Sequence, residues 1–365
     1  LSSYKVRESI CPLCPALERN RLAVLNSSTT KILSLGIVKR TSAGKTAESS
    51  VSPRVVGIRY NFPFAFMVAK ILKKSKPFLP LQPPDCCIIF HKSILLMSLN
   101  KVIFLGTGTS QGVPMIGCNC HVCRSESNKD KRLRTAAYIE YDGVKFVIDC
   151  GPDFRQQMLT HSINELDAVL LTHQHKDHTG GLDDIRAYNY FTKAAFPVYA
   201  EKRVQESLKK EYSYAFDQNK YPGVPEYNLI TIDEIPFNII TNKNGIERSV
   251  HIVPIRVMHY KLPILGYRIG NFAYITDGSF IPEAEFDKLK GVKTFVINTI
   301  RHEKHISHFS LGEALEIIKR VGAPRNYLTH LSHQIGTHQE LTKELQQMNM
   351  PYSVEPAYDG LTINI

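Results

Sequence analysis

The pattern of hydrophobic and polar positions changes character near residue 98. Beyond it, short apolar runs alternate with turn-forming residues, which is typical of a folded domain. Two alternating runs within 136–149 flank Asp142-Gly143, and this pair predicts a β-hairpin with a type I′ turn. Similar apolar runs predict further strands at 101–105, 167–171, 249–257, 265–269, 272–276, 294–298 and 326–329.

Apolar residues recur with helical spacing over 182–191, 202–210 and 311–321. Because strands outnumber helices, and hairpins are mixed with helices, we expect sheets packed face to face with helices outside them. The stretch 212–248 is rich in Pro, Asn and Tyr and fits neither period. We interpret it as an insertion or a lid.

Residues 1–96 show no sustained period and contain Ser/Thr clusters and scattered prolines. The chain begins with Leu1, whereas Met97 directly precedes the regular pattern. We therefore expect one folded domain over 97–365, preceded by a disordered or spurious extension over 1–96. A basic, Ser-rich leader is also typical of an organelle transit peptide, although the missing initiator Met weakens that interpretation.

The charge of the chain is distributed unevenly. Residues 1–97 hold 15 Lys and Arg against 4 Asp and Glu, while the remainder holds 30 of each kind. A neutral domain disfavours a long nucleic acid as partner. No apolar run reaches 18 residues, and 8 cysteines are too few for a disulfide scaffold, so we expect no membrane partner and a cytoplasmic location.

Four potential metal ligands follow the strand predicted at 167–171: His173, His175, Asp177 and His178. Imidazole nitrogen and carboxylate oxygen suit zinc, manganese or iron. The first two His are two residues apart, so at an extended strand end they share a face. Asp177 and His178 lie past the bend and can face a second ion. Gly180-Gly181 would allow a tight turn into the next helix.

The pattern His-x-His-x-Asp-His after an apolar strand resembles the metallo-β-lactamase superfamily of hydrolases, over about 98–365. The resemblance implies an α+β fold, a four-layer αββα sandwich. It also implies roles for later residues. Asp149 would orient the ligand loop, Asp277 would bridge two ions, and His330 would be the last ligand. Between the two remaining His, His259 fits the pattern better than His251, which lies within an alternating strand. One ion would then be held by His173, His175 and His259, and the other by Asp177, His178 and His330.

Three thiols within six residues, Cys118, Cys120 and Cys123, suggest a structural metal site that lacks one ligand. His121 or a distant group could complete it. The same Cys-x-Cys-x-x-Cys insert occurs in the phosphoribosyl 1,2-cyclic phosphate phosphodiesterases of the carbon–phosphorus lyase pathway, which this chain resembles. They complete the site with a His three residues beyond the last catalytic His, and that spacing gives His333 here.

This resemblance implies a hydrolase with two divalent ions, zinc or manganese, and one structural zinc. A hydroxide bridging the two ions would attack a small or cyclic phosphate ester, and Asp177 could take a proton from it. His308 would be a general acid for the leaving oxygen, and Lys261 and Arg301 are candidate phosphate contacts. The alternatives are a ribonuclease Z-like nuclease, a thioesterase or glyoxalase-like hydrolase of the same fold, and a non-catalytic binding module. A homodimer is compatible with each.

Overall fold

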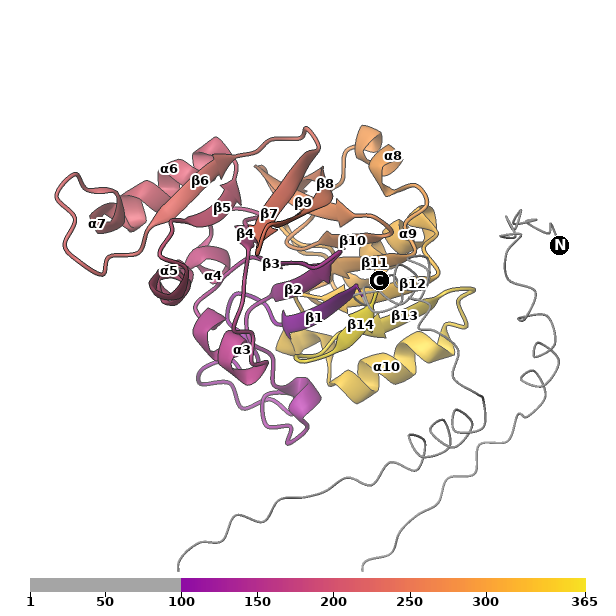
Figure 1. Ribbon diagram of the computed structural model, residues 1–365. Coiled ribbons are helices and arrows are strands. Elements are labelled where there is room, and N and C mark those ends of the chain that lie inside the picture. Colours follow the sequence, from indigo (N-terminus) through magenta and orange to yellow (C-terminus); the bar gives the residue numbers. More distant parts are fainter. Residues whose placement is uncertain (1–99) are drawn as a thin grey trace, which may run out of the picture. The chain divides into compact units, whose positions relative to one another are not determined.

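A computed structural model of the protein describes residues 100–365. The extension predicted for 1–96, and Met97, lie outside these residues. Figure 1 shows two β-sheets with helices around them. Within 100–365, no helix combines the length and the apolar character needed to cross a bilayer.

The first sheet holds seven strands in the order β14-β1-β2-β3-β4-β5-β6. Their bounds are β1 Lys101–Gly106, β2 Ala136–Tyr141, β3 Val144–Ile148, β4 Ala168–Leu170, β5 Phe196–Ala200, β6 Tyr227–Thr231 and β14 Thr362–Asn364. The last strand pairs with the first, so the two ends of the described chain meet in one sheet (Figure 1).

The second sheet also holds seven strands, in the order β13-β12-β11-β10-β9-β8-β7. Their bounds are β7 Phe237–Lys243, β8 Ile246–His259, β9 Leu262–Ile269, β10 Phe272–Ile275, β11 Thr294–Asn298, β12 Arg325–Thr329 and β13 Ser353–Pro356.

The two sheets repeat one pattern of pairing. Each has three antiparallel pairs followed by three parallel pairs, which run from β3 to β6 in the first sheet and from β10 to β13 in the second. Parallel neighbours end at the same edge of a sheet. The loops that leave β3 and β4 therefore lie together, as do those that leave β10, β11 and β12.

Helices cover the outer faces of both sheets. Their bounds are α3 Phe154–Thr160, α4 Lys176–Thr179, α5 Arg186–Thr192, α6 Lys202–Glu211, α7 Ser213–Phe216, α8 Phe286–Leu289, α9 Leu311–Val321 and α10 His338–Gln347. Short 3₁₀ turns span Asn128–Asp130, Leu182–Ile185, Glu283–Glu285 and His333–Ile335.

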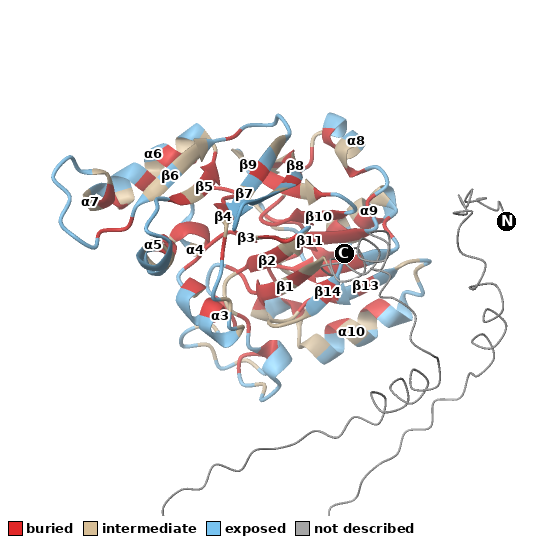
Figure 2. Ribbon diagram, viewed as in Figure 1, coloured by how far each residue is buried: buried red, intermediate tan, exposed pale blue. Residues whose placement is uncertain are grey.

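Three apolar layers separate these elements. Strands of both sheets share one cluster, in which Phe146 and Tyr267 are fully buried. A second cluster joins sheet one to α3 and α6, and a third joins sheet two to α8, α9 and α10. In β3 successive side chains enter different layers, Phe146 the inner and Val147 the outer. This arrangement confirms the αββα sandwich, and Figure 2 shows the buried strands at its centre.

The predicted hairpin is present as β2 and β3, and Asp142 and Gly143 both take positive φ (48° and 76°), as a type I′ turn requires. The helix predicted over 311–321 matches α9. The interpretation of 212–248 as an insertion or lid is wrong. This stretch supplies β6 and β7, which are the edge strands of the two sheets.

Candidate metal centre

The ligand loop follows β4 and enters α4, so its side chains gather at the carboxyl edge of sheet one. His173 and His178 are buried, whereas His175 is exposed. Nε2 of His173 lies 3.0 Å from Nδ1 of His175, and the rings of His173 and His178 lie 4.2 Å apart. The loop thus concentrates three imidazoles within a few ångströms.

Asp149 follows β3 and lies fully buried beneath this loop. Its Oδ1 accepts a hydrogen bond from the Thr172 backbone N–H (2.8 Å), and its Oδ2 lies 2.7 Å from Nδ1 of His178. The second contact directs Nε2 of His178 toward the other candidate ligands. The structure thus places Asp149 where the predicted orienting contact requires it.

Two glycines allow the loops after β3 and β4 to pack against each other. A Cβ at Gly151 would lie 2.0 Å from the Asp177 carbonyl oxygen, and one at Gly181 would lie 2.1 Å from the Gly151 carbonyl oxygen. Gly181 has a negative φ of −99°. Glycine is therefore required at position 181 because two backbone segments approach each other closely, and not because of the tight turn expected from the sequence.

Sheet two supplies the opposing side chains. Asp277 follows β10, His330 follows β12 and His259 ends β8. Oδ2 of Asp277 lies 3.1 Å from Nε2 of His178 and 3.3 Å from Nδ1 of His330. Asp277 therefore lies between the side chains of the two sheets, as a bridging carboxylate must.

The other predicted ligands join this cluster. The ring of His259 lies 5.5 Å from that of His173 and 5.2 Å from that of His175. Oδ2 of Asp177 lies 3.2 Å from Nε2 of His178. The structure therefore brings together all seven side chains predicted from the sequence as ligands.

Three of the predicted site residues have a strained backbone. Asp149, Asp277 and His330 take φ values of 65°, 56° and 58°, each just after a strand. This region costs a non-glycine residue roughly 1–2 kcal/mol, and such strain is concentrated at functional sites. The surrounding packing holds the three side chains in place against this cost.

The cluster fits a divalent metal. Ligand atoms about 2 Å from one ion lie within about 4 Å of each other. Two sets of three candidate ligand atoms lie within 4.8 Å of one another: His173, His175 and His259, and His173, His178 and Asp277. Nε2 of His178 and Nδ1 of His330 are buried without a hydrogen-bond partner among residues 100–365. Buried nitrogens are normally partnered, and a metal ion would supply the missing partner, displacing a proton where the nitrogen carries one.

The charge state of the site follows from its burial and its carboxylates. Burial favours a neutral His178, but Asp277 and Asp149 hold its pKa well above the ordinary value. Burial raises the pKa of Asp177, but His178 outweighs it and lowers that pKa below the ordinary range. Asp177 is therefore a carboxylate at neutral pH.

His308, the predicted general acid, lies against the same cluster. Its Nδ1 is 3.7 Å from Oδ1 of Asp277, and its ring stacks 4.7 Å from that of His330. Burial, together with the neighbouring His330, lowers the pKa of His308 to about 2. His259, Asp277 and His308 also form a third set with ligand spacing. The geometry accommodates either a ligand or a neutral donor at His308.

The candidate phosphate contacts lie farther out. Lys261 is exposed on the turn between β8 and β9. Arg301 donates to Oε1 of Gln334 (3.2 Å) and to the Lys304 carbonyl (3.1 Å), so those contacts occupy part of its guanidinium. His251 is exposed on β8, and its Nδ1 lies 3.0 Å from Oδ1 of Asn238, away from the cluster.

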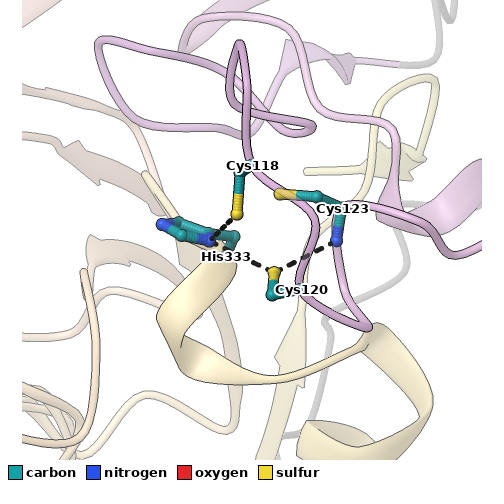
Figure 3. A group of neighbouring side chains, drawn as sticks. All are labelled: Cys118, Cys120, Cys123 and His333. Atoms are coloured by element: carbon teal, nitrogen blue, oxygen red, sulfur yellow. Dashed lines mark hydrogen bonds between the residues drawn. The ribbon is translucent and has the colours of Figure 1, made fainter.

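A second cluster lies beside the first and unites Cys118, Cys120, Cys123 and His333 (Figure 3). Nδ1 of His333 lies 3.3 Å from the sulfurs of Cys118 and Cys120. The hydrogen bond with His333 lowers the pKa of Cys120 to about 6, whereas burial raises that of Cys123 to about 11. Three sulfurs and one imidazole nitrogen are a donor set typical of structural zinc.

Two residues that hold the candidate ligands in place, Ser307 and Asn298, were not predicted from the sequence. The Ser307 carbonyl oxygen lies 2.7 Å from Nδ1 of His259 and so directs its Nε2 toward the cluster. Asn298 holds the loop after Asp277, because its side chain both donates to Gly278 and accepts from it. Asn298 is a polar residue at the end of an apolar strand, and this pattern is visible in the sequence. The contact of the Ser307 carbonyl with His259 has no such pattern in the sequence.

The comparisons with known proteins agree with this architecture. Residues 145–331 match the beta-lactamase superfamily domain, and the chain belongs to that superfamily. The two-sheet fold and the grouped His, Asp and Cys side chains agree with that membership.

Two solved structures are similar to this chain. The chain is similar to a solved diphosphatase of the PhnP family, with 33% identity, a TM-score of 0.63, and coverage of 73% of this chain and 98% of that one. Zn²⁺-bound PqqB from Methylobacterium extorquens shares the fold, at 16% identity and a TM-score of 0.58 over 73% of this chain and all of that one.

A curated relative from Porphyromonas gingivalis, named octanoyltransferase, is 43% identical over 264 residues. That match covers 72% of this chain but 51% of the relative. The chain thus spans about half the length of the first curated relatives that it matches.

Proposed function

We propose that this protein is a phosphodiesterase that uses two divalent ions to hydrolyse a small or cyclic phosphate ester. The observation that carries the proposal is the convergence of imidazoles and carboxylates from both sheets on Asp277. The similarity to a diphosphatase of the PhnP family supports phosphorus as the centre attacked.

Under this proposal, His173, His175 and His259 would hold one ion, Asp177, His178 and His330 would hold the other, and Asp277 would be shared between them. The ions supply Lewis acidity and lower the pKa of water toward neutrality. The chain supplies the geometry, since Asp149 orients His178 and the Ser307 carbonyl orients His259. The water oxygen forms a bond to phosphorus while the bond to the leaving oxygen breaks.

The leaving oxygen needs a proton as it departs. The low pKa of His308 keeps that imidazole neutral near pH 7, so its ring N–H would stabilise the leaving oxygen by a hydrogen bond, while solvent water would supply the proton. Asp177, a carboxylate at that pH, can accept a proton from the attacking water. We also propose that Cys118, Cys120, Cys123 and His333 hold a structural zinc.

A second candidate is hydrolysis of an acyl thioester. The name of the relative called octanoyltransferase points to chemistry on an acyl group, and the match covers 51% of that protein. The same ligands could act on a carbonyl centre. The two candidates differ in the atom attacked, and a substrate comparison separates them.

The test uses the full chain reconstituted with zinc or manganese, with Asp277→Ala and, as control, the exposed Asp287→Ala. We expect hydrolysis of glycerol 1,2-cyclic phosphate by the parent and the control. Asp277→Ala should lose at least about 100-fold in kcat/KM, as removal of a key electrostatic group does. It should also bind fewer ions per chain. Unchanged turnover would refute the bridging role, and faster cleavage of an octanoyl thioester than of any diester would favour the second candidate.

A further inference from the structure

Three large apolar side chains are exposed on the loops that surround His259. Tyr260 is 50% exposed, Phe280 58% and Ile306 68%. Large apolar side chains are more often buried, and a patch of them that is exposed on adjoining loops is a feature of interaction sites. We call these three residues the apolar rim.

Backbone contacts tie the rim to the metal cluster. Tyr260 directly follows His259, and its N–H donates to Oγ of Ser279 (2.9 Å). The next residue, Phe280, accepts at its carbonyl oxygen from the Met258 N–H (2.8 Å). Ile306 directly precedes Ser307, whose carbonyl contacts His259. All three loops therefore meet at one ligand of the proposed dinuclear site.

The backbone of Tyr260 is strained. It has a φ of 56°, within the range shared by Asp149, Asp277 and His330. Asn, Asp and His enter this region several-fold more readily than other residues, whereas a bulky residue there is an outlier. Tyr260 forms the two-residue turn between β8 and β9 with Lys261, a place where Gly or Asn is typical. The structure thus holds an exposed aromatic ring beside a metal ligand at a cost in stability.

Lys261 gives this surface a positive charge. Its Nζ lies 5.3 Å from the centre of the Tyr260 ring. A cation within about 6 Å of a ring centre is attracted to the aromatic face. The rim therefore combines apolar faces with a charge that suits a phosphate ester.

We propose that the apolar rim binds a planar aromatic group, such as a nucleobase, on the ester side of the substrate. This inference rests on the proposed phosphodiesterase function and specifies its substrate class. Stacking of a base on aromatic side chains strengthens binding roughly five- to a hundredfold per base. A substrate anchored at the cluster by its phosphate would place its organic group over the adjoining rim.

The experiment compares two cyclic diesters, adenosine 2′,3′-cyclic phosphate and glycerol 1,2-cyclic phosphate. The first carries an aromatic base and the second has no aromatic group. We expect the ratio of their kcat/KM values to exceed about tenfold for the parent protein. Tyr260→Asn removes the ring yet suits the left-handed backbone, so the variant should fold. It and Phe280→Ala should lower the ratio toward one. Tyr190→Asn, which removes an exposed tyrosine from α5, is the matched control and should keep the parental ratio.

A binding measurement separates failure of this inference from failure of the proposed function. Calorimetry on the metal-loaded chain would compare adenosine 5′-monophosphate with ribose 5-phosphate. Tighter binding of the nucleotide by about fivefold or more, lost in Tyr260→Asn, supports the rim whether or not either diester is cleaved. Equal affinities, or a preference that both rim variants retain, would overturn it. Absence of all diester hydrolysis, by contrast, would overturn the phosphodiesterase proposal alone.

Discussion

Replacing Asp149 by Asn tests how far one buried carboxylate controls the metal centre. Asp149 accepts from the Thr172 N–H through one oxygen and contacts Nδ1 of His178 through the other. An Asn side chain offers one acceptor and one NH₂ donor. Whichever way it turns, its NH₂ group faces either the Thr172 N–H or the N–H at Nδ1 of His178, so one of the two contacts is lost.

The expected size follows from these contacts. A hydrogen bond to a charged group contributes about 1.5–3 kcal/mol. Loss of the bond to His178 corresponds to a decrease in metal affinity of roughly 10- to 100-fold, which is also typical for the loss of a carboxylate that orients a ligand. The unpaired donor is fully buried, so the free energy of unfolding should fall by about 1–3 kcal/mol as well.

The assay is competition between the protein and a chromophoric chelator for zinc, followed by chemical denaturation. Asp167→Asn is the matched control, because Asp167 also accepts from a backbone N–H of the first sheet, that of Lys145 near the start of β3. The control should lose stability but keep the parental zinc affinity. Asp149→Ala removes both acceptors, whereas Asn can keep the one that faces His178. If Asp149→Ala binds zinc at the cluster as tightly as the parent, then Asp149 does not act through His178 and the reasoning fails.

The remaining predictions concern the thiol cluster and a buried carboxylate. Cys120→Ser should lower the melting temperature by roughly 5 °C or more, at 2–4 °C per kcal/mol, and change the catalytic rate of the folded fraction far less. Lost activity at an unchanged melting temperature would contradict a structural zinc. Burial raises the pKa of Asp359 from 3.8 to about 6, against hydrogen bonds from Leu133 and Thr107 that lower it. Its contribution to stability is therefore full below about pH 4 and is lost as the pH rises through 6. Relative to Asp359→Asn, the parent should lose up to about 3 kcal/mol across that interval, measured by urea unfolding, and parallel pH profiles would refute this.

Local patterns in the sequence predicted much of the fold. The hairpin of β2 and β3 and the helix α9 each carry their own signals, a turn pair in one case and a helical period in the other. The edge strands β6 and β7 carry weak signals, because one side of each faces solvent and polar residues interrupt the alternation. That is the physical reason why 212–248 was misread as an insertion or lid.

The candidate site could be predicted as far as its side chains cluster in sequence or end a strand. His173, His175 and His178 are close in the chain, and His259 could be distinguished from His251 because it ends its strand. Contacts through the backbone, such as that of Ser307 with His259, depend on how distant loops meet and leave no sequence pattern. The exposure of Tyr260 likewise required the structure.

The two halves of the metal cluster come from different sheets, with His173, His175 and His178 after β4 and Asp277 and His330 after β10 and β12. Ions held between them would act as a cross-link between the layers of the sandwich. Removal of the ions by a chelator should then speed amide hydrogen exchange at the periphery of the core between the sheets before it affects the centre of either sheet. The supply of metal ions would thus affect how firmly the two layers are held together as well as the chemistry of the site.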